Sequence, residues 1–375
     1  MILEPAFKHN NIPVIFSSDN NYALYLGVCI KSLIENSSIN NNYDIIIFDG
    51  GINEFIKKKI TAMKKANISI RFYDISEIIQ NYDTSIFQTR LHFTIATYYR
   101  FFLPQVCSKY DKILYIDCDT LICKDIAELY KIEIGNNYLG VTRDIQIIFN
   151  INNHPQEKTY YKKTLKMKKI ENYFQGGCLI CNIKEMIKDK LTSKLIERLK
   201  EVKTPKYVDQ CILNSVCEGK VKFIPQNWNY TWHLPIAYKC YKNFVPVPWQ
   251  TIYEEARKDP YIIHFTGIGM KPWINPAFEK AEYFWHYARQ TPFYEEILYK
   301  NLKVNPVQNI TQQITKVADM SIIREIKNYS KNRFNYYRCK LLANFTFGKM
   351  RKHYKDKKKR LKAKIKEVRR FLKGK

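Results

Sequence analysis

Two carboxylates stand two residues apart in the segment KILYIDCDTLICKD, residues 112–125, where Asp117 and Asp119 flank Cys118 at the end of an apolar run. Side chains at positions i and i+2 of an extended chain point the same way, so both carboxylates can converge on one cation. A buried carboxylate needs such a partner because an unpaired ion is costly to dehydrate. A divalent metal ion that carries a diphosphate meets this need, although a lone D-x-D pattern also occurs at ordinary solvated strand ends.

A second group of polar residues lies far along the chain in YIIHFTGIGMKPW, residues 261–273. His264 ends an apolar run, where an isolated histidine is commonly a hydrogen-bonded core residue. Gly267 and Gly269 let the backbone approach a phosphate closely, and Lys271 supplies a positive charge for it. One histidine with two aspartates makes a mixed nitrogen and oxygen site. Such a site favours Mn²⁺ as the cofactor, with Mg²⁺ as the alternative.

The first 75 residues alternate between strand and helix patterns. This alternation predicts βαβ units and a mainly parallel sheet with helices on its faces. In open sheets of this class the carboxyl ends of the strands form the crevice that binds ligands, and the D-x-D segment follows such an end. The predicted strands are residues 12–18, 43–51 and 68–75, and the predicted helices are residues 21–36 and 53–66.

The middle of the chain continues the α/β pattern. We predict a helix over residues 90–104 that ends at Pro104, then the D-x-D strand. Residues 145–172 are polar, rich in lysine and without a clear period, which is typical of a functional or mobile loop. Beyond Pro276 the pattern is helical. The further predicted elements are strands at residues 137–144 and 176–183 and a helix at residues 184–202.

The ten cysteines lie in apolar or strand-like runs, which favours reduced thiols and a cytoplasmic protein. The pair Cys178 and Cys181 lacks a second C-x-x-C or a nearby histidine pair, so we expect two small core residues rather than a zinc site. We expect neither a signal peptide nor a membrane-spanning segment, because neither pattern is found. The glycosylation pattern at Asn229 is then expected to be irrelevant.

Nearly half of the net charge of +27 lies at the carboxyl end, where residues 349–375 carry 15 Lys or Arg against Asp356 and Glu367. A basic helix with one apolar face is typical of binding to anionic membrane surfaces, and the alternative is a solvated tail. No RNA-binding motif accompanies this charge, so nucleic acid is not an expected partner. The residues on the predicted apolar face are Tyr354, Leu361, Ile365, Val368 and Leu372.

Two other classes of protein match parts of this pattern. Haloacid-dehalogenase-type phosphatases also end a strand in D-x-D, but they need a glycine after the second aspartate, and Thr120 stands there. A non-catalytic basic protein that keeps the sheet and binds a membrane or nucleic acid is the other class. The presence of all three candidate metal ligands argues against it.

Five segments occur in a characteristic order: FSSDNNYALYLGVCIKSL, HFTIATYYRFFLP, LYIDCDTLI, YVDQCILN and HFTGIGMKPW. In this order they resemble family 8 glycosyltransferases, the retaining, metal-dependent enzymes of the GT-A fold that include bacterial lipooligosaccharide galactosyltransferases. The resemblance covers about Ile12 to Trp273. It implies a Rossmann-like, mainly parallel mixed sheet flanked by helices. It also implies transfer of galactose or glucose from a UDP-sugar to a saccharide or glycolipid acceptor, in lipopolysaccharide or another surface glycan.

The resemblance also implies a role for each motif residue. Asp19, Asn21 and Tyr22 would hold the uracil and ribose, and Arg100 would meet the sugar and the diphosphate. The residues expected to bind the donor are Asp19, Asn21, Tyr22, His92, Thr97, Arg100, Asp117, Cys118, Asp119, Asp144, Gln175, Gly267 and Lys271. The residues expected to bind the metal are Asp117, Asp119 and His264.

The segment YVDQCILN is expected to supply the residues beside the anomeric carbon, Asp209 and Gln210. A metal ion acting as a Lewis acid, with Arg100 and Lys271, can stabilise the leaving diphosphate without a proton. Gln210 cannot easily form a glycosyl ester. We therefore expect Gln210 to orient or stabilise the cationic sugar, with Asp209 in support.

Two places depart from the family pattern. Gln175 and Gly176 stand where the family usually has Asn followed by Ala or Ser, and the longer side chain of Gln175 bears on which sugar is accepted. Three residues separate Gly267 from Lys271, one more than the commonest spacing.

Three regions are predicted in all. They are a GT-A nucleotide-sugar transferase domain at residues 1–275, a helical extension at residues 276–321 and a basic amphipathic tail at residues 322–375. We expect a cytoplasmic protein that the tail holds peripherally at the inner face of the cell membrane.

Overall fold

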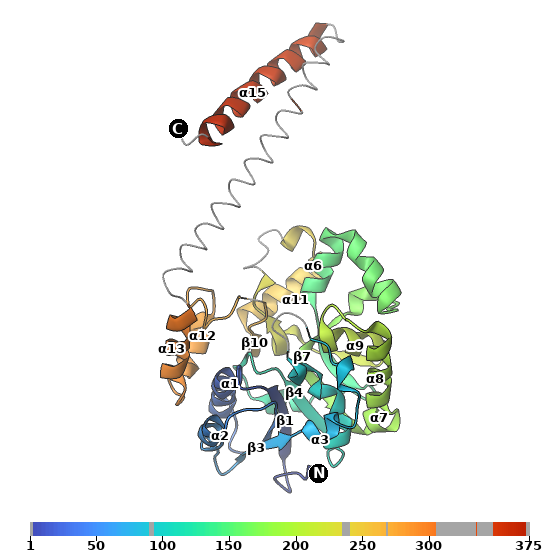
Figure 1. The fold of residues 1–375 in the computed structure, drawn as a ribbon, viewed down its shortest axis with the longest axis vertical. Coiled ribbons are helices and arrows are strands. Elements are labelled where there is room, and N and C mark those ends of the chain that lie inside the picture. Colours follow the sequence, from blue (N-terminus) through green and yellow to red (C-terminus); the bar gives the residue numbers. More distant parts are fainter. Residues whose placement is uncertain are drawn as a thin grey trace. The chain divides into compact units, whose positions relative to one another are not determined.

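The structure, a computed structural model, describes residues 3–89, 94–234, 241–267, 269–304, 335 and 348–372. The chain divides into two compact units, Met1–Leu298 and Tyr299–Lys375, which are described separately. The first unit is an α/β fold in which helices flank a central sheet (Figure 1). Every residue of the predicted site except His92 lies in the described part of this unit, and His92 lies outside the described residues.

The strands of the central sheet are β1 (Asn11–Ser18), β2 (Asn42–Asp49), β3 (Ile68–Asp74), β4 (Lys112–Ile116), β6 (Leu139–Arg143), β7 (Phe174–Asn182) and β8 (Val221–Phe223). Their order is β3-β2-β1-β4-β7-β6-β8. Neighbouring strands are parallel except at β7, which runs antiparallel to both β4 and β6. The predicted mainly parallel mixed sheet is therefore confirmed.

A second, three-stranded sheet lies against the end of β4. Its strands are β5 (Thr120–Ile122), β9 (Tyr230–Thr231) and β10 (Ile262–His264), in the order β5-β10-β9. The antiparallel register of β10 with β5 pairs His264 with Thr120. Because Thr120 directly follows the D-x-D segment, this register brings His264 to the two aspartates.

The α-helices are α1 (Ala23–Glu35), α2 (Glu54–Thr61), α3 (Ser76–Ile79), α4 (Leu103–Val106), α5 (Ile126–Tyr130), α6 (Ile145–Asn153), α7 (Ile183–Lys188), α8 (Leu191–Val202), α9 (Val208–Val216), α11 (Val247–Lys258), α12 (Ala281–Ala288), α13 (Tyr294–Val304) and α15 (Gly348–Leu372). In Figure 1, α1 and α2 lie on one side of the sheet and α7, α8 and α9 on the other. Side chains alternate along β1, so Val14 and Phe16 pack with α1 while Ile15 packs in the core that includes α8.

The five elements predicted in the first 75 residues are confirmed, with α2 ending at Thr61. The C-x-x-C interpretation is also confirmed, because Cys178 and Cys181 are fully buried core residues of β7. The predicted helix at residues 184–202 is instead two helices, α7 and α8. The break comes at Lys190, whose φ of +52° is left-handed and cannot continue a helix.

The prediction of one helix over residues 90–104 is wrong in the described part. A 3₁₀ helix spans Ile95–Phe102 and α4 follows, so Pro104 lies in the first turn of a helix and does not end one. Proline fits the first turn of a helix because its missing N–H has no partner there.

The prediction of an irregular loop over residues 145–172 is also wrong. The segment contains α6, two short 3₁₀ helices at Pro155–Glu157 and Ile170–Asn172, and a π-helical turn at Tyr160–Thr164. Its lysine-rich second half hid the pattern, although apolar residues are already dense in IQIIFNINN at its start. Apolar residues of this segment form a small core together with Cys211 of α9. Members of this core include Ile147, Ile151, Tyr161, Leu165 and Cys211.

The second unit is described mainly by α15, which confirms a helix in the basic tail from Gly348 to Leu372.

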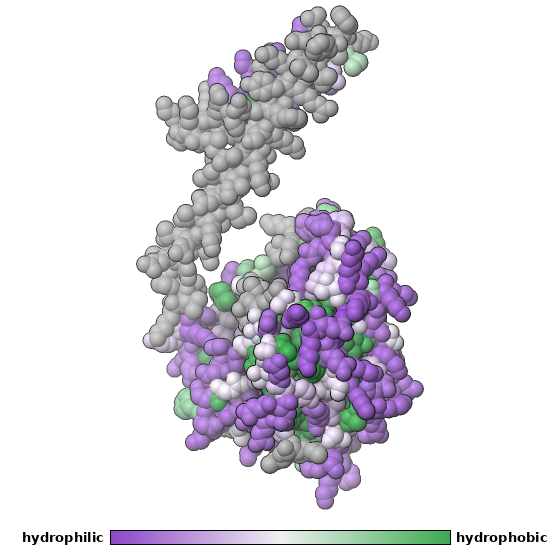
Figure 2. Space-filling model, turned by 45° about the vertical axis from the view of Figure 1, so that its right-hand side comes forward, coloured by the Kyte–Doolittle hydropathy of each residue, from purple (hydrophilic) through white to green (hydrophobic). Residues whose placement is uncertain are grey.

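Within the described residues, none of the helices is both long and apolar enough to cross a bilayer. Hydrophilic residues cover most of the coloured face in Figure 2. The bounds of the three predicted regions stay predictions.

Residues after 275 contribute to the core of the first unit. Phe293 is fully buried against α1, and a Cβ atom added at Gly27 would lie 2.3 Å from its Cε2 atom. The Tyr25 ring stacks on Trp273 with centroids 3.9 Å apart, and it also contacts Phe284 of α12. We therefore expect this segment to stabilise the helix that follows β1.

Phe293→Ala should lower the free energy of unfolding by about 3–5 kcal/mol, because the truncation leaves a cavity beside α1. As a matched control, Phe55→Ala removes a ring that is 63% exposed. That change should alter the free energy of unfolding by about 0.5 kcal/mol or less. Urea denaturation measures both values, and an equally small effect of Phe293→Ala would show that this segment does not stabilise the unit.

Candidate active site

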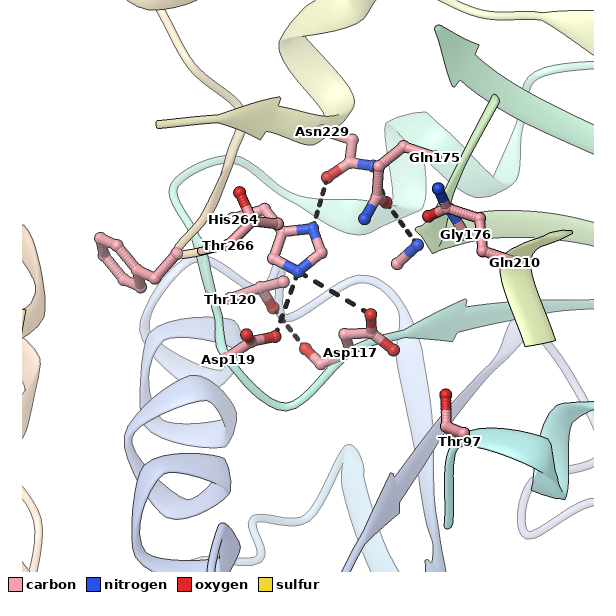
Figure 3. Close-up of polar contacts among 12 residues, drawn as sticks. Thr97, Asp117, Asp119, Thr120, Gln175, Gly176, Gln210, Asn229, His264 and Thr266 are labelled. Atoms are coloured by element: carbon pink, nitrogen blue, oxygen red, sulfur yellow. Dashed lines mark hydrogen bonds and ion pairs between the residues drawn. The ribbon is translucent and has the colours of Figure 1, made fainter. Parts of the chain in front are cut away.

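The two aspartates lie in the turn between the two sheets, held by backbone contacts. The Asp117 N–H donates to the Gly177 carbonyl at 2.8 Å, which continues the pairing of β4 with β7. The Thr120 hydroxyl donates to the Asp117 carbonyl at 2.9 Å, and the Phe265 N–H donates to the Asp119 carbonyl at 3.0 Å. Both sheets therefore fix this turn, which Figure 3 shows beside His264.

Asp117, Asp119 and His264 form one cluster of potential metal ligands, as the sequence predicts. One ligand atom from each lies within 4.8 Å of the other two. His264 Nε2 is 3.1 Å from Asp119 Oδ1 and 3.8 Å from Asp117 Oδ2. Two carboxylates and an imidazole are a donor set that suits a first-row divalent ion, so these residues fit a metal.

Gly177 keeps this cluster compact. A Cβ atom added there would lie 2.2 Å from His264 Cε1 and 2.6 Å from Asp117 Oδ2. Side chains do not pack so closely, so any residue other than glycine would push two of the ligands away. The sequence contains this glycine in the pair Gly176-Gly177, but its contact with His264 depends on the second sheet.

Two cations flank the aspartates. Arg100 is buried, and its Nη2 atom donates to Asp117 Oδ1 at 2.7 Å. Lys271 Nζ donates to Asp119 Oδ2 at 2.5 Å and to the Phe265 carbonyl at 2.6 Å. Lys271 therefore reaches the site in spite of the extra residue before it. Burial favours the neutral form of Asp119, but its attraction to Lys271 and its contact with His264 outweigh burial and hold the pKa of Asp119 well below its usual range.

Asp209 is a buried carboxyl on the other side of Arg100. The Arg100 Nε atom is 3.1 Å from Asp209 Oδ2, and the Thr97 hydroxyl donates to Asp209 Oδ1. Burial raises the pKa of Asp209 to about 6, since the attraction of Arg100 and the bond from Thr97 only partly offset the loss of water. The first turn of α9 places this residue, so its side chain faces inward from a regular element.

Gln210 bridges two elements of the site. Its Nε2 atom donates to Asp144 Oδ2 at 2.9 Å, and its Oε1 atom accepts the Gly176 N–H at 2.9 Å. Asp144 caps α6 by accepting the Ile147 N–H at 3.2 Å, and burial raises its pKa. Both oxygens of Asp144 are therefore hydrogen-bonded, and the amide of Gln210 is held in one orientation.

A pocket of about 110 Å³ opens beside the aspartates at the carboxyl end of β1. Asp19 forms part of the wall of this pocket. Its Oδ1 atom accepts hydrogen bonds from the N–H groups of Asn21 at 2.9 Å and Tyr22 at 3.1 Å. The pocket is lined by Ser17, Ser18, Asp19, Tyr22, Thr94, Ala96, Thr97, Arg100, Tyr115, Asp117, Cys118 and Asp119. Seven predicted site residues thus share one pocket.

The remaining predicted residues lie around the same centre. Gly267 and Gly269 have φ angles of +96° and +71°, a backbone region that glycine adopts without strain, in the loop between His264 and Lys271. Gln175 lies on β7, and its Oε1 atom accepts the Gly177 N–H at 2.5 Å and the Asn229 amide at 2.7 Å.

Asn229 is the main residue of this site that the sequence does not reveal. It is fully buried, and its Oδ1 atom is 3.0 Å from His264 Nδ1 (Figure 3). Its only sequence signal is a glycosylation pattern, which says nothing about a neighbour 35 residues away. The burial agrees with the expectation that this pattern is irrelevant.

Comparison with known proteins gives a consistent result. The family model described as glycosyl transferase family 8 matches residues 13–277. A Haemophilus influenzae protein whose name marks it as a glycosyltransferase is 35% identical over 221 residues, which are 58% of this chain and 63% of that protein. A lipopolysaccharide 1,2-glucosyltransferase of Escherichia coli is 26% identical over 283 residues, 72% of this chain and 76% of the relative.

Solved structures share the fold. The bifunctional glycosyltransferase WbbM is similar with a TM-score of 0.70 and 31% identity, over 80% of this chain and 53% of that chain. The galactosyltransferase LgtC, solved with donor and acceptor sugar analogues, has a TM-score of 0.60 and 25% identity, over 75% of this chain and 96% of its own. The chain thus spans less than two thirds of the Haemophilus relative and of WbbM. These likenesses confirm the predicted GT-A architecture.

The raised pKa of Asp209 predicts a specific pH dependence of stability. An unfolded aspartate titrates near pH 3.9, so folding favours the protonated form, and the stability this group contributes is lost as the pH rises through about 6. Between pH 4.5 and 7.5 the loss should be about 2 kcal/mol. Asp209→Asn should remove this part of the decline.

Urea denaturation across this pH range, in the presence of a chelator, measures the effect as the difference between the two proteins. Asp111→Asn removes an exposed carboxylate that pairs only with Lys184 among the described residues, and it serves as the control. The same pH dependence in Asp209→Asn and in the unmodified chain would contradict the assignment.

Proposed function

Because this chain belongs to glycosyltransferase family 8, we propose that it transfers a hexose, galactose or glucose, from a UDP-sugar to a saccharide acceptor with retention of configuration and with a divalent metal ion. The observation that carries this proposal is the cluster of Asp117, Asp119 and His264, with Arg100 and Lys271 on either side of it. A site of two acids, one imidazole and two cations suits a metal-bound diphosphate. Mn²⁺ is the proposed ion, with Mg²⁺ as the alternative.

Asp117, Asp119 and His264 would hold the metal, which when bound supplies Lewis-acid stabilisation of the leaving diphosphate. Arg100 and Lys271 add positive charge at fixed positions, so negative charge that develops on the leaving group meets groups that are already oriented. Asp19, Asn21 and Tyr22 are proposed to hold the uridine in the adjoining pocket, with Thr97 and Cys118 in its wall.

Gln210 is proposed to act at the anomeric carbon. Its amide is held by Asp144 and by the Gly176 N–H, so its carbonyl oxygen can face the positive charge that develops on the sugar. Asp209 supports Arg100 and is already committed to two partners, which makes it a poor nucleophile.

The acceptor hydroxyl would attack from the face that the diphosphate leaves. Its oxygen forms the new glycosidic bond, the bond from the sugar to the phosphate oxygen breaks, and a phosphate oxygen takes the proton.

The acceptor is proposed to be a saccharide or glycolipid of a bacterial surface glycan such as lipopolysaccharide. Support comes from the E. coli relative, whose name is a lipopolysaccharide glucosyltransferase. The basic helix α15 would bind an anionic membrane surface, in agreement with an acceptor anchored in lipid. A cytoplasmic location at the inner face of the membrane follows from this proposal.

Hydrolysis of UDP-glucose and UDP-galactose without acceptor tests the donor and the metal together. Activity should depend on Mn²⁺ and be lost with a chelator, and Asp119→Asn and His264→Ala should each lower it by about 100-fold or more, since each removes a ligand. Asp111→Asn changes an exposed carboxylate that pairs with Lys184, not with a residue of the cluster, so it should leave activity unchanged. No turnover and no UDP binding would favour a non-catalytic binding protein instead.

Gln210→Ala should lower the rate of transfer by about 100-fold, as for other groups that stabilise developing charge, while leaving UDP binding nearly unchanged. Turnover of a UDP-sugar and calorimetric binding of UDP with Mn²⁺ measure the two quantities. Full transfer activity in Gln210→Ala, beside loss of activity in Asp117→Ala, would show that Gln210 does not have this role.

Liposome co-sedimentation tests the membrane proposal. The chain should bind vesicles rich in phosphatidylglycerol, and replacing Lys357, Lys358, Lys359 and Arg360 by glutamine should weaken binding by about 10-fold or more, because each basic residue near the surface contributes about 1 kcal/mol. Equal binding to anionic and to neutral phosphatidylcholine vesicles would contradict it.

A further inference from the structure

We propose that Gln175 and Asn229 are positioning residues that fix the tautomer of His264 and thereby decide which ring nitrogen faces the metal ligands. This inference rests on the metal site of the proposed function and assigns a role to two residues outside the metal's direct ligands. The three side chains form a continuous chain of hydrogen bonds, from Gly177 through Gln175 and Asn229 to His264. Figure 3 shows Gln175, Asn229 and His264 and marks the contact between Asn229 and His264.

The direction of this chain is fixed at one end by a backbone group. The Gly177 N–H can only donate, so the Gln175 side-chain atom at 2.5 Å from it must be the carbonyl oxygen. The same oxygen lies 2.7 Å from the Asn229 amide, which must therefore present its NH₂ group to it. The orientation of both amides follows from the backbone and needs no assumption about either side chain.

The orientation of Asn229 then determines the state of His264. With its NH₂ group bonded to Gln175, Asn229 presents its oxygen to His264 Nδ1 at 3.0 Å. An oxygen acceptor requires a proton on Nδ1. In the neutral imidazole the lone pair is consequently on Nε2, the atom that faces Asp119 at 3.1 Å and Asp117 at 3.8 Å.

Burial keeps solvent away from this chain of hydrogen bonds. Asn229 and His264 are almost inaccessible to solvent, so water cannot substitute freely for a lost partner. The Asn229 carbonyl also accepts from the Gln226 amide at 3.2 Å, which holds its backbone. Groups that orient a ligating histidine in this way raise the affinity for the metal, and their removal typically weakens it by about 10–100-fold.

Gly177 anchors both halves of the cluster. Its N–H starts the chain that ends at His264, and its carbonyl accepts the Asp117 N–H at 2.8 Å. Gln175, which departs from the usual family residue, has its oxygen engaged with Gly177 and Asn229. Its amide nitrogen is then the part of this side chain that remains for a donor hydroxyl.

The test is a double-mutant cycle on Mn²⁺ affinity, measured with Mn²⁺ alone by the electron paramagnetic resonance signal of the free ion on the full chain. Asn229→Ala should weaken binding by about 10–100-fold in the unmodified chain. In a His264→Ala background, Asn229→Ala should cause no further loss, because its effect acts through the imidazole. An unchanged affinity in the first background, or the same fold-loss in both, would overturn the proposal.

A matched pair at Gln175 decides the question even where Asn229→Ala fails to fold. Gln175→Glu keeps an oxygen acceptor for Gly177 and Asn229 and should retain or exceed the unmodified affinity for Mn²⁺. Gln175→Met has a similar length but no acceptor and should weaken it, and equal affinities of these two variants would overturn the proposal. Absence of Mn²⁺ binding by the unmodified chain would overturn the metal site and this role together, whereas normal binding by Asn229→Ala would overturn this role alone.

Discussion

Repulsion between the carboxylates of Asp117 and Asp119 is the constraint on which the rest of the site depends. Their ligand atoms lie within 4.8 Å of one another, where two like charges repel by about 3 kcal/mol or more at an effective dielectric constant of about 20. A cation offsets this repulsion at each carboxylate, because Arg100 pairs with Asp117 and Lys271 pairs with Asp119. Each of these two carboxylates therefore has a cation beside it, and Arg100 is shared with Asp209.

The charged and ligating residues of the site come from four different segments of the fold. Arg100 comes from the 3₁₀ helix before α4, the aspartates from the turn between β4 and β5, and His264 and Lys271 from the second sheet and the loop after it. The antiparallel pairing of β10 with β5 joins His264 and Lys271 to the aspartates. A shift of that register by one residue would turn His264 away from the aspartates, since successive side chains of a strand point to opposite faces. The small second sheet thus matters more to the site than its size suggests.

Much of this could be predicted from the sequence because the signals are local. Strand and helix alternation predicted the mainly parallel sheet, and the residue types of Asp117, Asp119 and His264 predicted the cluster of potential metal ligands that the fold brings together. The failures came where local patterns do not decide the structure. Residues 145–172 carry apolar side chains without a clear period over the whole segment, and several of them pack around Cys211, which lies far along the chain. Asn229 was missed for a related reason, since it ends a 3₁₀ helix and contacts His264 of β10, which is distant in sequence.

The acids of the site divide into two classes according to their surroundings. Asp119 is half-buried beside Lys271 and His264, which keep its pKa low and its charge available for a cation. Asp144 is half-buried and Asp209 is buried, and both have less compensation for the loss of water, so their pKa values rise, that of Asp209 to about 6. Environments that separate the pKa values of neighbouring carboxyls commonly separate their roles. Asp209 is held by Arg100 and Thr97, which agrees with its proposed role in support of that cation. The neutral amide of Gln210 next to it then carries no charge that would compete with the aspartates for the metal, and it can still present an oxygen to a cationic sugar.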